Sequence, residues 1–190
     1  MKRICVYCGS SSGSRSEYLE TATCLGQCLA DRGIGIVYGG AEVGLMGAVA
    51  SSAIERGGEV IGVIPELFAE KVKHNKLSQL HIVPTMHDRK KKMFDLSDGF
   101  IALPGGIGTI EEVFEILAWA QLGYHEKPCG ILNVCGYFDS IIEFLEHSVN
   151  QHFLKQAHRE MIMFDENANS MLEQFESYKA PAEPKWMKMN

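Results

Sequence analysis

The 190-residue sequence has no long apolar run and no surplus of positive charge, and each absence excludes a class of protein. No stretch approaches the roughly 18 uninterrupted apolar residues that a membrane-spanning helix needs, so we expect no membrane partner. The formal net charge is −6, whereas a surface that binds nucleic acid needs clustered lysine and arginine. We therefore expect no nucleic-acid partner, although a small anion needs only a local positive site.

Motifs for three other features are also missing. The seven histidines are scattered and form no H-E-x-x-H pattern, so we expect no metal. No segment reads G-x-x-x-x-G-K-[ST], which disfavours a P-loop triphosphatase. The first residues are basic, but they meet polar residues and glycine too soon for a signal peptide. The expected location is therefore the cytoplasm.

The six cysteines are expected to be reduced thiols in a cytoplasmic chain. Cys5 and Cys8 lie in an apolar run, where a strand would point the two thiols to opposite faces of a sheet. Cys24 and Cys28 have the spacing of neighbours on a helix. Because free cysteine commonly packs as a small buried hydrophobe, core packing is favoured over metal or redox chemistry for these residues.

The recurring unit of the sequence is a short apolar strand, a glycine-rich or polar turn, and a segment long enough for a helix. The expected strands lack polar alternation, which is typical of a sheet covered on both faces. The pattern predicts one α/β domain over residues 1–180, with a doubly wound, mostly parallel sheet of about seven strands flanked by helices. The expected strands are 4–8, 35–38, 60–64, 80–83, 100–103, 130–134 and 161–164. The expected helices are 16–31, 44–56, 88–96, 109–122, 137–150 and 167–177.

Two segments depart from this regular pattern. The connection over residues 65–79 is the least regular, and we expect it to be mobile. The tail over residues 181–190 holds two prolines and no periodicity, so we expect a flexible C-terminus.

Glycine-rich turns follow three of the expected strands and give the first indication of a ligand site. These turns are 9–13, 39–44 and 104–109. In an open parallel sheet, ligands bind outside the carboxyl ends of the strands, where such turns collect. Glycine lets the backbone approach a ligand closely, and a helix that begins there offers free N–H donors to a phosphate. One such turn is ordinary loop chemistry, whereas three at one end of a sheet favour a nucleotide site.

The third turn differs from the fingerprint of dinucleotide-binding proteins. Glu111 stands where G-x-G-x-x-G requires its last glycine, and its carboxylate would meet the pyrophosphate, so a dinucleotide dehydrogenase is disfavoured. Thr109 and Glu112 also match the capping box T-x-x-E, in which Glu112 would only bond back to the helix start. A capping glutamate does not require a proline and three glycines ahead of it. Glu111 and Glu112 are therefore also candidates to face the sugar or base of a nucleotide.

Four consecutive cations, from Arg89 to Lys92, stand at the start of an expected helix in this acidic chain. Asp88 is available as the N-cap of that helix. Cations at a helix N-terminus oppose the helix dipole, so the run is unfavourable unless an anion lies nearby. Lys91 and Lys92 fit a solvated patch, whereas Arg89 lies nearest to a strand end. The planar guanidinium of Arg89 suits a phosphate or a developing charge.

Several motifs together resemble the LONELY GUY family of cytokinin riboside 5′-monophosphate phosphoribohydrolases, long mislabelled as lysine decarboxylases. The resemblance runs from about residue 4 to residue 150. Its most specific motifs are P-G-G-x-G-T-x-x-E, which ends at Glu112, and Met-x-x-Arg-Lys, which begins at Met86. It implies a Rossmann-like homodimer without a cofactor. Such an enzyme hydrolyses the N-glycosidic bond of a nucleoside 5′-monophosphate, giving the free base and ribose 5-phosphate.

The resemblance also implies which residues form the site. The catalytic pair would be Arg89 and Glu112. The substrate contacts would fall on Arg89, Lys90, Gly105, Gly106, Ile107, Gly108, Thr109, Ile110, Glu111 and Glu112. Further candidates are Gly9, Ser10, Gly39, Gly40 and Met86. A glutamate of the family aligns near Glu70 or Lys71, and Ala41 and Ala118 depart from the family pattern. These positions leave open whether AMP or a cytokinin riboside 5′-monophosphate is preferred.

The chemistry of the candidate residues agrees with this implication. Cleavage of a glycosidic bond passes through an oxocarbenium-like state, which a carboxylate such as Glu112 stabilises while it activates water. Arg89 would either position the substrate or assist the leaving base. A non-catalytic nucleotide or molybdenum-cofactor carrier is the main alternative, but it has no need of both Arg89 and Glu112. A pyridoxal-dependent decarboxylase would require a Schiff-base lysine in an apolar pocket, whereas the obvious lysines lie in a solvated run.

Overall fold

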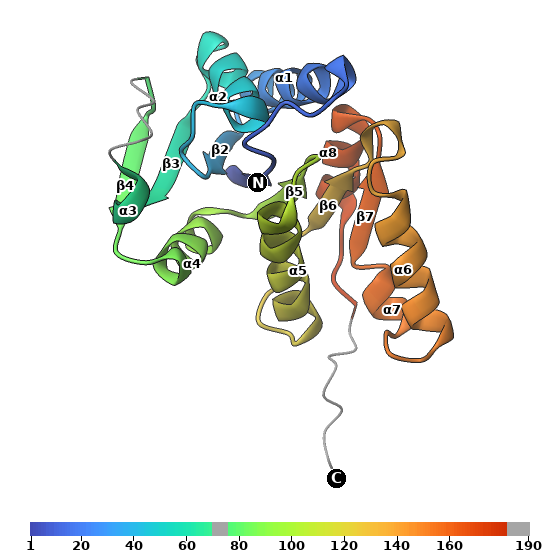
Figure 1. Ribbon diagram of the computed structural model, residues 1–190. Coiled ribbons are helices and arrows are strands. Elements are labelled where there is room, and N and C mark those ends of the chain that lie inside the picture. The colour runs from blue at the N-terminus through green and yellow to red at the C-terminus, as the bar shows by residue number, and fades with distance from the viewer. Residues whose placement is uncertain (70–75, 182–190) are drawn as a thin grey trace.

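Seven parallel strands form one sheet through the centre of the molecule, with helices on both of its faces (Figure 1). The computed structural model describes residues 1–69 and 76–181. The strand order is β4-β3-β2-β1-β5-β6-β7, and every pairing is parallel. The expected Rossmann-like, doubly wound α/β fold is therefore confirmed. The strands are β1 Arg3–Tyr7, β2 Gly35–Tyr38, β3 Val60–Pro65, β4 Gln79–Val83, β5 Gly99–Ala102, β6 Cys129–Leu132 and β7 Ile162–Asp165.

The six expected helices lie close to their expected positions in the sequence, whereas the short helices α3 and α7 were not expected. Their bounds are α1 Ser16–Asp31, α2 Gly44–Glu55, α3 Glu66–Ala69, α4 Met86–Leu96, α5 Ile107–Gln121, α6 Asp139–Asn150, α7 Gln156–Arg159 and α8 Ala168–Ser177, with a short 3₁₀ turn, η1, over Val134–Gly136. None of these helices is long and apolar enough to cross a membrane. Part of the segment 65–79 expected to be mobile, residues 70–75, and nearly all of the expected flexible tail, residues 182–190, lie outside the described residues.

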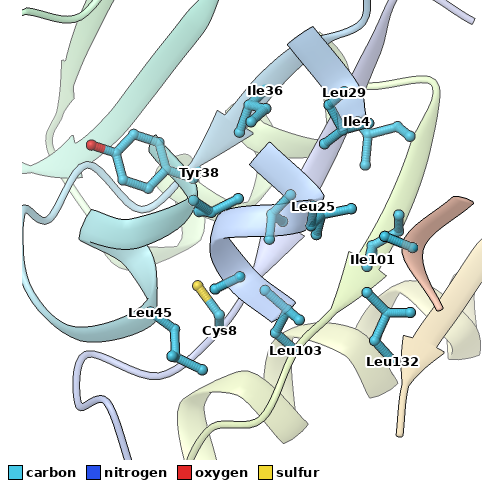
Figure 2. Packing of buried hydrophobic residues seen from close by; sticks show 14 of the residues in the cluster. Ile4, Cys8, Leu25, Leu29, Ile36, Tyr38, Leu45, Ile101, Leu103 and Leu132 are labelled. Atoms are coloured by element: carbon cyan, nitrogen blue, oxygen red, sulfur yellow. The ribbon is translucent and has the colours of Figure 1, made fainter. Parts of the chain in front are cut away.

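Successive side chains of each strand point to opposite faces of the sheet, so the buried side chains form two separate cores. Ile4, Val6 and Cys8 pack on one face of the sheet with residues of α1, α2 and α8, as Figure 2 shows for the centre of this cluster. Cys5 and Tyr7 pack on the other face with residues of α4, α5 and α6. The expected opposite placement of Cys5 and Cys8 is therefore confirmed, and both thiols are buried.

The core-packing prediction is wrong for Cys24. Its side chain is exposed on α1, and its Sγ lies 3.8 Å from that of the half-buried Cys28. The apolar stripe of α1 runs through Tyr18, Ala22, Leu25 and Leu29, and Cys24 falls outside that stripe. Helical spacing relates the two cysteines to each other but does not turn both of them inward.

Two helix starts differ from the expected ones, and both bear on the candidate site. Thr85, not Asp88, is the N-cap of α4, and its Oγ1 accepts a hydrogen bond of 3.1 Å from the Asp88 N–H. Gly106 is the N-cap of α5. Thr109 is therefore the third residue of that helix rather than its cap, and the alternative of a T-x-x-E capping box is wrong.

The winding of the sheet changes direction beside β1. From β1 the chain builds outward through β2, β3 and β4, and it then returns to place β5 on the other side of β1. In doubly wound sheets the connections that follow two such strands leave on opposite faces, which opens a crevice at the carboxyl ends of the strands. The fold thus places the glycine turns after β1 and β5 at the usual position of a ligand site.

Candidate active site

A cavity of about 230 Å³ lies at the carboxyl ends of β1, β2 and β5. All three expected glycine turns contribute to it, which places them in one crevice. The cavity is lined by Val6, Tyr7, Cys8, Gly9, Ser10, Gly39, Met46, Arg89, Met93, Gly106, Gly108, Thr109 and Glu112. Polar and charged groups from α4 and α5 thus face glycine backbone from the first two turns.

An ion pair between α4 and α5 borders this cavity. Arg89 Nη1 lies 3.1 Å from Glu112 Oε1, and the two side chains are only 14% and 12% exposed. The guanidinium is fixed from two further directions, because Arg89 Nε donates to the Val63 carbonyl oxygen at 3.2 Å and Nη1 lies 3.3 Å from the Met86 sulfur. The pair is therefore preorganised and largely removed from water.

The Glu112 carboxyl has an altered affinity for protons. Burial raises its pKa, the Arg89 guanidinium acts in the opposite direction, and the nearby Glu111 carboxylate adds to the upward shift. Burial prevails because a desolvated carboxylate loses the water that stabilises its charge. A carboxyl group with a raised pKa next to a fixed cation is the type of group that exchanges protons during catalysis.

Glycines allow the three turns to approach one another closely. A side chain on Gly105 would collide with Thr109 Oγ1 and with the Gly9 nitrogen, and a side chain on Gly39 would collide with the Arg89 guanidinium. The Gly9 N–H also donates to the Pro104 carbonyl oxygen at 3.0 Å, which ties the first turn to the third. These glycines are therefore required by the packing of the turns around the cavity.

The N-terminus of α5 provides the donors expected of an anion site. Its first N–H groups have no partner within the helix, and the helix dipole adds partial positive charge there. Gly106, Gly108 and Thr109 belong to this first turn and line the cavity. Together with the Ser10 side chain, they can hold a phosphate without a lysine.

Lys90 and Glu111 form a second ion-pair cluster, away from this cavity. Lys90 Nζ lies 2.5 Å from Glu111 Oε1 and 3.0 Å from Glu115 Oε1, with its side chain only 10% exposed. Burial disfavours the charged ammonium, but the hydrogen bonds that it donates to the two carboxylates outweigh this effect and raise the pKa of Lys90. The ammonium is therefore already engaged by two anions.

The structure brings some of the expected site residues together and separates others. Those that line the cavity are Gly9, Ser10, Gly39, Arg89, Gly106, Gly108, Thr109 and Glu112. Those that do not line it are Gly40, Met86, Lys90, Gly105, Ile107, Ile110 and Glu111. Ile107 is 89% exposed on the first turn of α5, and Glu70 and Lys71 lie outside the described residues.

Five lining residues were not expected from the sequence as site residues: Val6, Tyr7, Cys8, Met46 and Met93. Helical periodicity could have identified Met93, because it follows Arg89 by one turn on the same face of α4. Met46 follows the turn after β2 and lies in the first turn of α2. Val6 and Tyr7 of β1, and Cys8 directly after it, gave no local signal, since they read as ordinary core.

Comparison with known proteins adds information on family and fold. A family model described as "Possible lysine decarboxylase" matches residues 46–175. The chain is 45% identical over 179 residues to cytokinin riboside 5′-monophosphate phosphoribohydrolase LOG5 of Arabidopsis thaliana, covering 94% of this chain and 78% of the relative. It is 43% identical over 178 residues to the phosphoribohydrolase LOG of Oryza sativa subsp. japonica, covering 93% and 74%.

Among solved structures, the molybdenum cofactor binding protein of Rippkaea orientalis superposes with a TM-score of 0.71 over 93% of this chain and 97% of that one. The sequence identity is 22%. This likeness establishes the shared fold and nothing about the ligand.

Proposed function

Because the chain belongs to the LONELY GUY family of cytokinin riboside 5′-monophosphate phosphoribohydrolases, we propose that it hydrolyses the N-glycosidic bond of a nucleoside 5′-monophosphate, releasing the free base and ribose 5-phosphate. One observation carries this proposal beyond family membership. The buried ion pair of Arg89 and Glu112 opens onto the same cavity as the N-terminus of α5. A desolvated carboxylate and a helix N-terminus suited to phosphate thus lie within one crevice.

The phosphate group of the substrate binds at the start of α5. Backbone N–H groups of Gly106, Gly108 and Thr109 donate to its oxygens, and the helix dipole stabilises its charge. An anchored phosphate restricts the ribose to one orientation, which brings the anomeric carbon toward Glu112 and lowers the entropic cost of reaction. Unphosphorylated nucleosides lack this anchor and are poor substrates.

Glu112 acts on the anomeric carbon and on the attacking water. The bond between C1′ and the base nitrogen breaks, and its electron pair leaves with the base. The Glu112 carboxylate stabilises the oxocarbenium-like ribose and accepts a proton from the water whose oxygen bonds to C1′. The base nitrogen gains one proton and Glu112 releases the proton that it accepted, so one water is consumed per bond cleaved. Arg89 holds the carboxylate in place and is the only cation among the described residues that line the cavity.

The residues present do not fit a pyridoxal-dependent decarboxylase, the activity that the description of the family model suggests. Such an enzyme needs a lysine amine that can become neutral and form a Schiff base within the pocket. No lysine lines the cavity within the described part of the chain. Lys90 is the lysine next to Arg89, and its raised pKa keeps it charged.

We further propose that the protein is a cytoplasmic homodimer. The edge strand β4 and its neighbours α3 and α4 expose Leu67, Leu80, Ile82 and Met86, at 78%, 43%, 55% and 42% respectively. Exposed apolar side chains along an unpaired strand edge favour association unless another surface covers them. Light scattering tests the dimer, with an expected mass near twice 21.1 kDa.

The proposed cytoplasmic location is supported by the cysteines. All six are free thiols, in keeping with a reducing compartment.

Chromatography of the reaction products tests the proposed reaction. The protein is incubated with AMP, with isopentenyladenosine monophosphate, with other nucleoside monophosphates and with the matching unphosphorylated nucleosides. We expect free base and ribose 5-phosphate from monophosphates and at least about 100-fold less base from nucleosides, because the phosphate anchor is lost. The ratio between AMP and the prenylated substrate identifies the preferred base. Failure to release base from every monophosphate would refute the proposal and favour a carrier.

A further inference from the structure

The hydroxyl of Tyr137 contacts the glycine turn from outside the cavity. Tyr137 lies on the connection between β6 and α6, and its Oη donates to the Gly105 carbonyl oxygen at 2.7 Å. Gly105 belongs to the P-G-G turn that precedes α5, 32 residues earlier in the chain. The Tyr137 side chain thus joins the connection between β6 and α6 to the turn between β5 and α5.

The connection that carries Tyr137 holds an unusual backbone conformation. Cys135 has a φ of +52° and Gly136 a φ of +71°, and a non-glycine residue in this region is strained. The Asn133 side chain stabilises the connection, because its Oδ1 accepts from the Phe138 N–H at 2.7 Å and its Nδ2 donates to Asp139 Oδ1 at 2.8 Å. Such strain persists where the surroundings determine the conformation, and it is common beside functional sites.

Aromatic contacts fix the direction of the Tyr137 ring. The ring packs edge-on against Tyr18 at a centroid distance of 5.6 Å and against Phe138 at 4.9 Å. Tyr137 and Gly105 both line a second cavity of about 290 Å³, which also borders Gly9, Ser10 and Gly106. The hydroxyl therefore reaches Gly105 from the side of this second cavity.

The peptide between Gly105 and Gly106 is the group that this hydrogen bond orients. In a trans peptide the C=O and the following N–H point in opposite directions. Because Tyr137 draws the Gly105 carbonyl toward the second cavity, the Gly106 N–H turns away from it. Gly106 also borders the cavity that holds Arg89 and Glu112. A peptide between two glycines rotates readily when nothing restrains it.

We propose that Tyr137 is a positioning residue for substrate phosphate, and that its hydroxyl fixes the Gly105–Gly106 peptide so that the Gly106 N–H faces the bound phosphate. This role rests on the proposed function, since it concerns the phosphate anchor of that same site. Tyr137 itself does not line the cavity of Arg89 and Glu112. It acts through the turn and makes no contact with the reacting atoms.

The test compares Tyr137→Phe with the wild type in both binding and turnover. The variant removes only the hydroxyl and retains the ring contacts with Tyr18 and Phe138. We expect about a fivefold weaker affinity for ribose 5-phosphate by calorimetry, from the loss of one oriented donor. We expect the same increase in KM for the monophosphate, with kcat within about twofold of wild type, since ground-state and transition-state phosphate binding fall together. Free adenine affinity and the thermal midpoint stay unchanged.

A matched control separates this role from a general effect of losing a tyrosine hydroxyl. Tyr124→Phe makes the same chemical change at a residue that is 77% exposed in the loop after α5, and we expect it to match wild type throughout. Unchanged ribose 5-phosphate affinity in Tyr137→Phe would overturn the role of Tyr137, even in a wild type that hydrolyses monophosphates. So would an equal loss of adenine and ribose 5-phosphate affinity. A wild type that releases no base but binds ribose 5-phosphate in a Tyr137-dependent manner would refute the reaction and support the positioning role.

Discussion

Two ion-pair clusters connect α4 to α5, and they differ in what their charges are free to do. Arg89 pairs with Glu112, whereas the next residue, Lys90, pairs with Glu111 and Glu115. The two cations are similarly buried, at 14% and 10% side-chain exposure, but the carboxylates are not. Glu112 is 12% exposed, whereas Glu115 is 26% and Glu111 51% exposed.

The difference follows from helix geometry. Consecutive residues on a helix point about 100° apart, so Arg89 and Glu112 face the cavity while Lys90 and Glu111 face away from it. Lys90 has two carboxylate partners that keep contact with water. Its cluster therefore only connects the two helices. Glu112 has one partner and little water. Buried ion pairs contribute weakly to stability, so a desolvated pair beside a cavity indicates chemistry.

The largest expected effect is on kcat, and it distinguishes the two clusters when one carboxylate is removed from each in turn. Glu112→Gln preserves the shape of the side chain but removes its basicity, and we expect kcat to fall by about 1,000-fold, within the range for loss of a general base. Glu115→Gln removes the same charge from the same helix, and we expect its kcat to stay within about twofold of wild type. Initial rates of base release at saturating monophosphate measure both. If Glu112→Gln retained near wild-type release, the comparison would fail.

The sequence was sufficient to predict the fold, and the family resemblance singled out the proposed catalytic pair. Its strands and helices form from apolar runs and glycine turns that carry local signals, and the turns after β1, β2 and β5 necessarily meet because the sheet is parallel. The motif ending at Glu112 and the pattern containing Arg89 identified a cation and a carboxylate that the fold brings to 3.1 Å. Local signals of this kind are available without a structure.

Other features depend on packing that the sequence does not record. Lys90 and Glu111 were expected among the substrate contacts but do not line the cavity. Which of two adjacent residues faces the cavity depends on how α4 lies against α5. The contact between Tyr137 and Gly105 joins two connections and follows no periodicity. The helix starts at Met86 and Ile107 were missed because Asp88 and Thr109 are themselves good capping residues.

An intermediate effect concerns the pH dependence of turnover. The pKa of Glu112 is raised by burial, against the influence of Arg89, so the carboxylate that the proposed reaction needs forms at a higher pH than that of an ordinary glutamate, whose pKa is about 4.3. We expect kcat/KM to fall with decreasing pH through this raised pKa. The pH dependence of folding stability has the opposite sign. The folded state holds the proton more tightly than the unfolded state, so the contribution of Glu112 to stability is lost as pH rises through that window.

A pH–rate profile of the wild type and of Glu115→Gln measures this effect. The Glu115 carboxylate contributes a small part of the upward shift in the pKa of Glu112, so the acidic limb of the variant should move slightly toward lower pH. An acidic limb at the ordinary glutamate pKa in both proteins would mean that Glu112 is not the titrating base. The difference in burial between the two clusters would then not correspond to a difference in chemical role.

The smallest expected effect comes from removing the cation of the second cluster. Lys90→Met keeps the length of the apolar stem, and it leaves no carboxylate stranded away from water, which is the condition under which breaking a buried ion pair is strongly destabilising. We expect the free energy of unfolding to change by about 1 kcal/mol or less, because Glu111 and Glu115 retain access to water. KM and kcat should stay within about twofold at the pH optimum. Lys90 is also a substrate contact by family resemblance, so steady-state kinetics decides between the two roles. A KM increase above about tenfold, equivalent to 1.4 kcal/mol, would mean that Lys90 leaves its carboxylates to bind the phosphate, and the two clusters would then form one site.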